Sequence, residues 1–327
     1  MKTISDIASI AGVAKSTVSR FLNGGSVSER TRQKIERAIK ETGFVPNPFA
    51  QSLKAKVPNI IGTIVPRLDS YAASQTLIGI DEYLRELGYQ MFIANTSQSL
   101  EREIESIYTL AHQKVAGIIL LATQITEEHI EAFQKINIPI MLVGQEYNKV
   151  YSVIHDDYGA GYEMGKYVLG HGHRKLAYLG VTEKDIAVGV KRKAGFTQAV
   201  QEQAGCEVRY FETSFSMMDS IQIVSSIIHT YSPTVIVCAT DNLALGAMKA
   251  AYVNELQVPH DLSITGFGGY DVAEMLHPSL TTTKFYYKQA GKRAAERIVK
   301  LVNKEEIPLQ LISNFKIVDR ESVDKKV

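Results

Sequence analysis

The sequence predicts an α/β protein in which a small, all-helical N-terminal head precedes a two-lobed body built on two parallel sheets. Three observations predict this class. The first 45 residues combine helical periodicity with turn residues and contain no strand pattern. From Asn59 onward, short β-branched apolar runs alternate with amphipathic stretches, as in repeated βαβ units. This alternation then occurs a second time, so we expect two similar lobes, each with a parallel sheet.

The charge of the chain is unevenly distributed. The 327 residues, 45% of them apolar, are enough for several packed domains. Residues 1–56 contain ten Lys/Arg against four Asp/Glu, and the rest contain 26 against 31. A basic head on a slightly acidic body predicts a polyanionic partner for the head alone. Two cysteines make no disulfide framework, and no membrane span or signal peptide is apparent, so we expect a cytoplasmic protein without membrane contacts.

The head is predicted to contain three short helices. An apolar-periodic segment from Ile4 to Ala11 stops at Gly12 and restarts at Ser16, and a third helical pattern runs from Ser28 to Gly43. The second helix holds Ser, Thr, Ser and Arg where a structural helix more often carries Ala, Glu and Lys. Two helices joined by a Gly-containing turn indicate a helix-turn-helix, whose second helix enters the DNA major groove. A purely structural three-helix domain is the alternative, which the local positive charge disfavours.

The helix-turn-helix pattern assigns roles to individual side chains. Ile7, Ala8, Val18 and Phe21 are the core candidates. The exposed face of the second helix would read base edges, with Arg or Lys suited to guanine; its residues are Lys15, Ser16 and Arg20. Short polar residues would contact phosphates, which set register without reading sequence; these are Thr3, Thr17, Ser19, Asn23, Ser28 and Thr31.

The body is predicted to contain two sets of strands. The first set is expected at residues 60–66, 89–95, 117–123 and 138–144, and the second at 175–181, 206–213, 234–240 and 262–268. Amphipathic segments such as 74–88 and 100–114 separate them and predict helices. In open parallel sheets, ligands bind at the carboxyl ends of the strands. We therefore expect a ligand site in the crevice between the two lobes.

Several sequence blocks resemble a known family. The head contains D-I-A, A-G-V, T-V-S-R, L-N-G, V-S-x-x-T-R and G-F-x-P-N-x-x-A-x-x-L. With these motifs it resembles the headpiece of the lactose/galactose repressor family of bacterial transcriptional regulators. The resemblance continues through the body in "IGTIVPRLDS", "LGHGHRKLAYLG", "KRKAGF", "ATDNLALGAMKA", "LSITGFGGYD", "HPSLTTTKF" and "VDRES". It implies a helix-turn-helix headpiece, a hinge helix and a body like a periplasmic binding protein.

The resemblance also implies domain boundaries and hinge contacts. The headpiece would take residues 1–45, the hinge and linker 46–58, and the effector-binding and dimerisation domain 59–327. Within that domain, lobe 1 would take 59–157 and 288–312, and lobe 2 would take 158–287 and 313–327. In the hinge, Leu53 would be the apolar wedge in the minor groove, and Asn47 would approach the DNA backbone. Pro48 stands where many relatives carry Arg or Ala, so one basic contact is absent.

The same resemblance implies an effector site in the cleft. Arg192 would hydrogen-bond sugar hydroxyls or other polar groups, and Phe215 would supply a stacking wall. The other implied residues are Ser70, Tyr71, Thr240, Asp241, Phe285 and Tyr287. Relatives commonly read G-F/Y-D-D after the late strand, whereas this chain reads Gly-Phe-Gly-Gly-Tyr-Asp at residues 266–271, so the expected carboxylate is absent. We expect a roomier and less acidic pocket.

The sequence thus favours a dimeric repressor that a small sugar or sugar phosphate releases from a pseudo-palindromic operator. The "GFGGYD" version resembles that of sucrose-operon repressors from Gram-positive bacteria, which implies sucrose or its 6-phosphate as the inducer. Lys191, Lys193 and Arg67 could meet a phosphate or could be solvated surface charges. A family member that responds to another metabolite or a protein corepressor remains an alternative, and so does a sugar-processing enzyme. No nucleophile elbow, phosphate loop or metal-ligand set supports an enzyme, and we expect no cofactor.

Overall fold

The computed structural model describes residues 2–22, 24–44 and 59–326. The predicted hinge helix at 46–58, with Asn47 and Leu53, lies outside the described residues, as does Asn23. Among the described residues, no helix has the length and apolar character needed to cross a bilayer. The same residues contain no cluster of three or more His, Cys, Asp or Glu side chains able to hold a metal ion.

The head is a three-helix unit, as predicted. Its helices are α1 (Ile4–Ala11), α2 (Lys15–Leu22) and α3 (Glu29–Thr42). Thr3 caps α1 and Ser28 caps α3, each accepting a backbone N–H of the first turn. Gly12, at φ 63°, ends α1 in the left-handed region that favours glycine. Ile7, Val18 and Ile35 are fully buried where the three helices meet.

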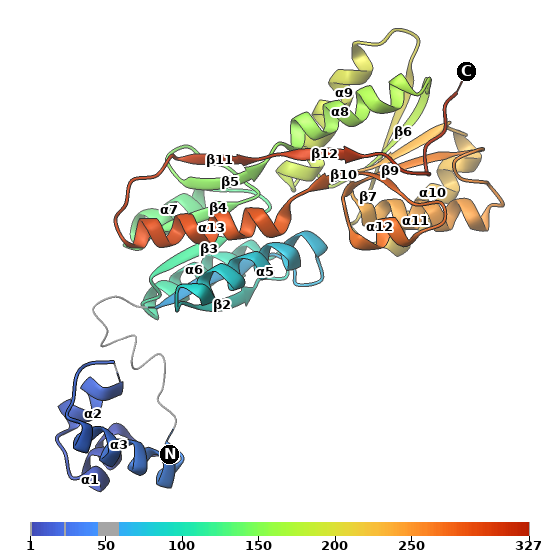
Figure 1. Ribbon diagram of the computed structural model, residues 1–327. Helices are drawn as coiled ribbons and strands as arrows, with labels where there is room; N and C mark the ends of the chain where they lie inside the picture. Colours follow the sequence, from blue (N-terminus) through green and yellow to red (C-terminus); the bar gives the residue numbers. More distant parts are fainter. Residues whose placement is uncertain (1, 23, 45–58, 327) are drawn as a thin grey trace.

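The first lobe is a six-stranded parallel sheet with helices on both faces (Figure 1). Its strand order is β11-β5-β4-β3-β1-β2. The strands are β1 (Ile60–Val65), β2 (Gln90–Asn95), β3 (Gly117–Leu120), β4 (Ile140–Val143), β5 (Tyr151–His155) and β11 (Gln310–Ser313). Helices α5 (Tyr71–Glu86) and α13 (Tyr287–Val302) pack together on one face, and α6 (Leu100–His112) and α7 (Glu127–Lys135) cover the other.

The second lobe repeats this arrangement with one antiparallel edge. Its order is β12-β10-β9-β8-β6-β7, and only β12 runs antiparallel to its neighbour. The strands are β6 (Lys175–Val181), β7 (Glu207–Thr213), β8 (Val235–Cys238), β9 (Ser263–Gly268), β10 (Thr281–Phe285) and β12 (Phe315–Val318). The helices are α8 (Asp157–Gly170), the π-helical turn η1 (Ile186–Lys191), α9 (Arg192–Gln201), α10 (Met217–Thr230), α11 (Asp241–Val253) and α12 (Asp271–Met275).

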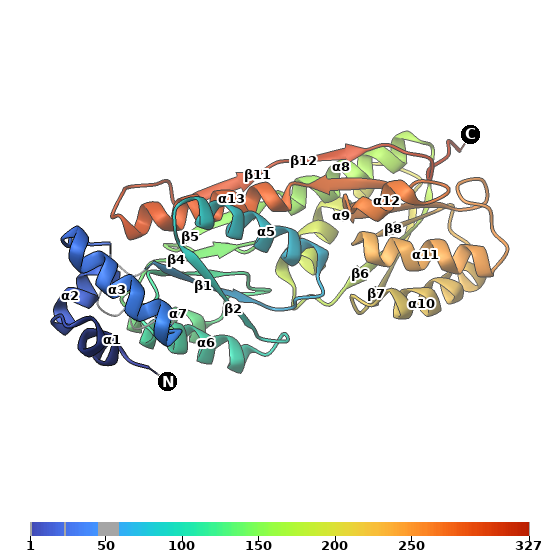
Figure 2. The same cartoon turned by 60° about the horizontal axis from the view of Figure 1, so that its bottom comes forward.

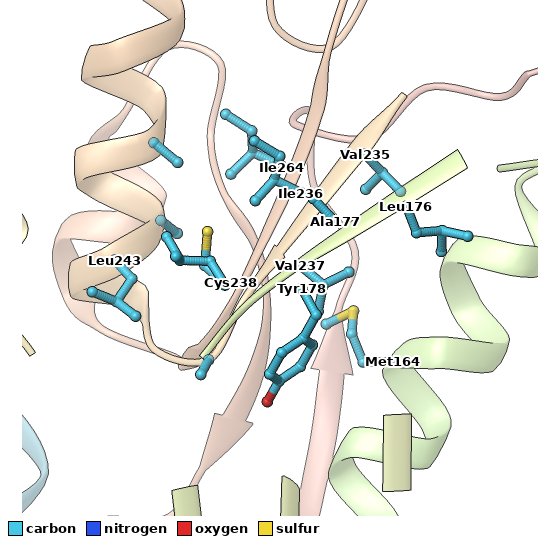
Figure 3. Packing of buried hydrophobic residues seen from close by; sticks show 14 of the residues in the cluster. Met164, Leu176, Ala177, Tyr178, Val235, Ile236, Val237, Cys238, Leu243 and Ile264 are labelled. Carbon is cyan, nitrogen blue, oxygen red and sulfur yellow. The ribbon is translucent and has the colours of Figure 1, made fainter. Parts of the chain in front are cut away.

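The core of the second lobe lies on both faces of its central strands. Cys238 and Leu243 lie on the side of α11, whereas Tyr178 packs beside Met164 of α8 (Figure 3). Cys238 is a fully buried free thiol, and burial raises its pKa. The alternation of faces along β6 and β8 follows from the strand period of two. The predicted fold class is therefore confirmed.

The chain passes between the two sheets three times. The crossings lie between β5 and α8, between β10 and α13, and between β11 and β12 (Figure 2). Each lobe is therefore assembled from segments far apart in the sequence. Three adjacent crossings allow one lobe to move relative to the other while both sheets stay intact.

Candidate functional site

The outer face of α2 presents unengaged polar side chains. Lys15, Ser16 and Arg20 are exposed, while Val18 on the opposite face is buried. None of these three side chains forms a hydrogen bond or ion pair within the described parts of the chain. Their donors are therefore free for a partner, and Lys and Arg at such positions suit guanine edges in a major groove.

The predicted phosphate-contacting residues divide into two groups. Thr17 and Ser19 are half-buried on α2. Thr3, Ser28 and Thr31 lie at helix N-termini, where the Thr3 and Ser28 hydroxyls serve as caps. The Thr3 hydroxyl also pairs with Asp6, and the Ser28 and Thr31 oxygens are 2.8 Å apart. Helix N-termini attract phosphate through backbone N–H groups. The capping role of these hydroxyls is thus compatible with a nearby DNA backbone.

A small cavity lies between the lobes, at the carboxyl ends of strands from both sheets. This inner cavity measures about 120 Å³. Its walls combine hydrogen-bonding and aromatic side chains. They are Pro66, Arg67, Ser70, Ala72, Gln98, Thr123, Asp185, Val188, Arg192, Phe215, Thr240, Asn242, Phe267, Tyr270 and Tyr287. The expected crevice therefore contains a pocket that is lined by residues of both lobes.

Five of the eight predicted effector residues meet in the inner cavity. They are Ser70, Arg192, Phe215, Thr240 and Tyr287. Ser70 and Thr240 also cap α5 and α11, which holds both hydroxyls at helix N-termini. Tyr71 and Phe285 instead line a second, outer cavity of about 420 Å³. Asp241 lines neither cavity.

Arg192 is the most constrained side chain of the site. It begins α9 directly after the π-helical turn η1 and is only 4% exposed. Its Nε donates to Asp157 Oδ1 at 3.1 Å, and its two terminal nitrogens donate to Asp157 and to the Ala239 carbonyl. The guanidinium also lies 4.9 Å from the ring centroids of Phe267 and of Phe285.

These contacts hold the Arg192 side chain in place but leave N–H groups that can donate hydrogen bonds to a ligand. Burial alone would lower its pKa, but the adjacent Asp157 carboxylate raises the pKa above the ordinary value. Arginine has five N–H groups, so one remains free on each terminal nitrogen beside the cavity. A ligand hydroxyl or anionic oxygen placed there would meet a rigid, permanently charged donor.

Asp241 lies behind the cavity instead of in its wall. It is fully buried and accepts the Tyr270 N–H at 2.7 Å and the Thr282 hydroxyl at 2.5 Å. The effector role expected for Asp241 therefore has no geometric support, because one carboxylate oxygen holds the β9–α12 turn at Tyr270 and the other holds Thr282 of β10. Burial raises the pKa of Asp241 to about 6, against the lowering effect of these hydrogen bonds.

The raised pKa of Asp241 predicts a pH-dependent stability. Between pH 4 and pH 6 the folded protein keeps a proton that the unfolded chain releases, so the free energy of unfolding should fall as pH rises through this window. The expected loss is about 3 kcal/mol. Chemical denaturation at pH 4, 5, 6 and 7 should show this decline in the native protein and a flatter profile in Asp241→Asn. Equal slopes in both proteins would contradict the assignment.

The Gly-Gly-Tyr departure places an aromatic ring in the cavity wall. Gly268 and Gly269 have φ of 146° and 70°, and a Cβ on Gly268 would lie 2.3 Å from the Tyr270 ring. The glycine pair therefore allows the turn that brings Tyr270 into the cavity wall. Tyr270 is only 8% exposed, and its ring stacks on Tyr71. An aromatic side chain thus contributes to the cavity wall beside the turn where relatives carry a carboxylate.

The three predicted phosphate-binding cations have different environments. Lys191 pairs with Glu146 at 2.5 Å, and Lys193 pairs with Glu183 at 3.0 Å, both away from the inner cavity. Arg67 lines the cavity and lies 4.8 Å from the Phe215 ring centroid. Of the three, only Arg67 can offer charge to a ligand there.

Several polar residues of the cavity wall were not predicted from the sequence. Asp185, Gln98, Thr123 and Asn242 all line the inner cavity. Each follows the end of a strand by three or four residues. That position was the available signal, because the residues after parallel strands form the crevice. Asp185 supplies a carboxylate, and burial raises its pKa.

The fold and sites together define a class of protein. A helix-turn-helix with free basic side chains is joined to a two-lobed body that encloses a polar, aromatic cavity, which is the organisation of a ligand-responsive DNA-binding regulator. Residues 3–47 match the model of bacterial regulatory proteins of the lacI family, and residues 166–323 match that of a periplasmic binding protein-like domain.

Whole-chain relatives agree with these matches. The chain is 38% identical to the sucrose operon repressor of Staphylococcus xylosus, over 95% of this chain and 97% of the relative. It is 30% identical to the HTH-type transcriptional repressor PurR of Vibrio atlanticus, over 99% of both. A lac repressor dimer bound to operator and an anti-inducer superposes with a TM-score of 0.88, at 25% identity and 99% coverage of both chains. The chain therefore belongs to the LacI family of DNA-binding transcriptional repressors and is not an enzyme.

Proposed function

We propose that this protein is a homodimeric repressor of a sugar-utilisation operon, released from a pseudo-palindromic operator by a small sugar or sugar phosphate. Sucrose or sucrose 6-phosphate is the preferred effector. The observation that carries the proposal is the inner cavity, which combines a fixed guanidinium with aromatic walls. Release requires that the effector distinguish two states of the body that differ in DNA contacts.

The wall chemistry supports a sugar. Asp185 accepts hydrogen bonds, Arg192 donates them, and the Gln98 and Asn242 amides do both. Sugar hydroxyls need this mixture, and the apolar faces of a sugar ring suit aromatic side chains such as Phe215. The identity of the Staphylococcus xylosus relative supports sucrose in particular. For a phosphorylated sugar, Arg67 is the available cation.

The structural relative supports dimerisation. The lac repressor relative is a dimer on its operator, and a dimer of this chain would present two heads to two half-sites.

A thermal-shift panel tests the effector assignment. The full-length protein is heated with sucrose, fructose, glucose, galactose, trehalose and their phosphates. A ligand at about 100 times its Kd should add roughly 2.7 kcal/mol to the stability. A shift with sucrose or its 6-phosphate alone supports the proposal. A shift with another metabolite only would favour the alternative family role, and no shift would favour a protein corepressor.

Salt dependence tests the DNA-binding part. Operator binding through several phosphate contacts should weaken by roughly 10³-fold or more between 50 and 200 mM salt. Fluorescence anisotropy on a labelled operator measures this slope. A flat salt dependence would contradict phosphate-based recognition by the basic head.

Leu53→Ser should weaken operator binding selectively. By the family resemblance Leu53 inserts into the central minor-groove step, and a polar replacement loses the apolar wedge that stabilises a kinked duplex. Anisotropy should show weaker binding to the operator and unchanged binding to non-specific DNA. Equal effects on both DNAs would contradict a wedge. Leu68→Ser, at an exposed site of the body, is the matched control.

A further inference from the structure

One aromatic pair separates two cavities and joins the two lobes. Tyr270 of the second lobe lines the inner cavity, and Tyr71 of the first lobe lines the outer cavity. Their ring centroids are 4.1 Å apart with an interplanar angle of 27°. Tyr287 lines both cavities. The stack therefore forms part of the wall between the two spaces, and it requires the lobes to be this close.

The cavity volumes indicate that this wall limits ligand size. The inner cavity measures about 120 Å³ and the outer one about 420 Å³. Pockets that enclose small-molecule ligands generally measure about 300–1,000 Å³. The space beside Arg192 is below that range and suits at most a small, one-ring ligand, whereas the two cavities joined would fall within the range. A ligand that reaches Arg192 and exceeds one sugar ring must extend past the stack.

The two tyrosines differ in their freedom to move. Tyr270 is 8% exposed, and its backbone N–H is held by the buried Asp241 carboxylate. The hydroxyl of Tyr270 has no hydrogen-bond partner among the described residues. Tyr71 is half-buried at the first position of α5 and borders the larger, outer space, and one side-chain hydrogen bond, to Asp271 of α12, must break when it moves. Tyr71 is therefore the ring with room to leave the stack.

We propose that Tyr71 is a size gate of the effector site. With Tyr71 stacked on Tyr270 the site takes one-ring sugars, and two-ring sugars bind only when Tyr71 leaves the stack and joins the cavities. The inference rests on the proposed function, since it takes the effector to be a sugar. It adds that one side chain sets the affinity difference between one-ring and two-ring ligands.

Loss of the gate should favour the longer ligand. Breaking an aromatic pair opposes the binding of a two-ring sugar, so Tyr71→Ala removes this cost. By the usual strength of such pairs, sucrose should bind about threefold to tenfold more tightly. Glucose and fructose, which leave the stack in place, should change by less than about twofold. Tyr71→Phe keeps the stacked ring and removes only the hydroxyl that pairs with Asp271, so it measures the contribution of that contact separately from the stack. Tyr158→Ala, an exposed tyrosine in the first turn of α8, is the matched control.

A ligand-free measurement tests the stack itself. The chain contains no tryptophan, so Tyr270→Trp introduces a single indole at the gate. Acrylamide quenching of its emission should rise at least about twofold when Tyr71→Ala is added, because a stacked partner shields a ring from solvent. Adding Tyr158→Ala should leave the quenching unchanged. No increase with Tyr71→Ala would overturn the proposal.

Calorimetric titration of the full-length protein with sucrose, glucose and fructose then tests the gate. The gate is supported if Tyr71→Ala binds sucrose more tightly than the native protein does, while its affinities for glucose and fructose stay nearly unchanged. Weaker sucrose binding, or equal changes for all three sugars, overturns the gate and leaves the proposed function intact. If no sugar binds the native protein, the result contradicts both the proposed function and the gate.

Discussion

Arg192→Met is expected to give a repressor that binds operator but no longer responds to effector. The substitution removes the guanidinium that lines the inner cavity, together with its two N–H groups that have no partner among the described residues. It also leaves the Asp157 carboxylate, 3% exposed, without its partner. Removing one member of a buried ion pair costs about 3–5 kcal/mol, so the body should also be less stable. Chemical denaturation and operator release by effector measure the two effects separately.

The double variant Arg192→Met/Asp157→Asn separates signalling from folding. With both charges removed, no uncompensated buried charge remains, and most of the lost stability should return. Operator binding without effector should match the native protein, while effector response should still be absent. Normal release of the double variant by the effector would place the effector site elsewhere.

Arg20→Ala is expected to abolish the preference for operator over random DNA. Arg20 is exposed on α2 and has no partner within the described residues, so the fold should be unaffected. A bidentate arginine–guanine contact contributes about 1–3 kcal/mol of discrimination per site. In a dimer the loss occurs in both half-sites. The ratio of operator to random-DNA affinity, measured by anisotropy at fixed salt, is the relevant quantity.

Arg37→Ala provides the matched control for charge. Arg37 is exposed on α3, in the same basic head. Its loss should weaken binding to all DNA sequences to a similar extent, as for a general electrostatic contribution. Equal selectivity in Arg20→Ala and the native protein would contradict the assignment of α2 as the recognition helix.

Local sequence patterns predicted the first four strands of each sheet but not the last two. The predicted strands are apolar runs of four to seven residues, and β1, β3, β4, β8 and β9 are buried on both faces. In contrast, β10 buries Thr281, Thr282 and Thr283, whose polar side chains give no apolar signal. The strands β11 and β12 have only four residues each and lie at sheet edges. Their pairing partners are distant in sequence, so tertiary contacts decide them.

The sequence predicted several of the side chains that line the site, but not the positions of Asp241 and Tyr270. Arg192, Ser70 and Thr240 follow from family motifs and do line the cavity. Asp241 does not, because hydrogen bonds from Tyr270 in the β9–α12 turn and from Thr282 of β10 occupy its carboxylate. Tyr270 joins the wall because two glycines with positive φ allow a tight turn before it. No sequence pattern reports which way such a turn directs its next side chain.

The sequence by itself determined the three-helix head, the two parallel-sheet lobes and the class of DNA-binding regulator. Those properties depend on periodicity, capping residues and local charge, which neighbouring residues establish. The tertiary structure alone decided the size of the cavity and the contact of Tyr71 with Tyr270. These two residues are far apart in the chain and belong to different lobes, and they meet because three chain crossings hold the carboxyl ends of both sheets together.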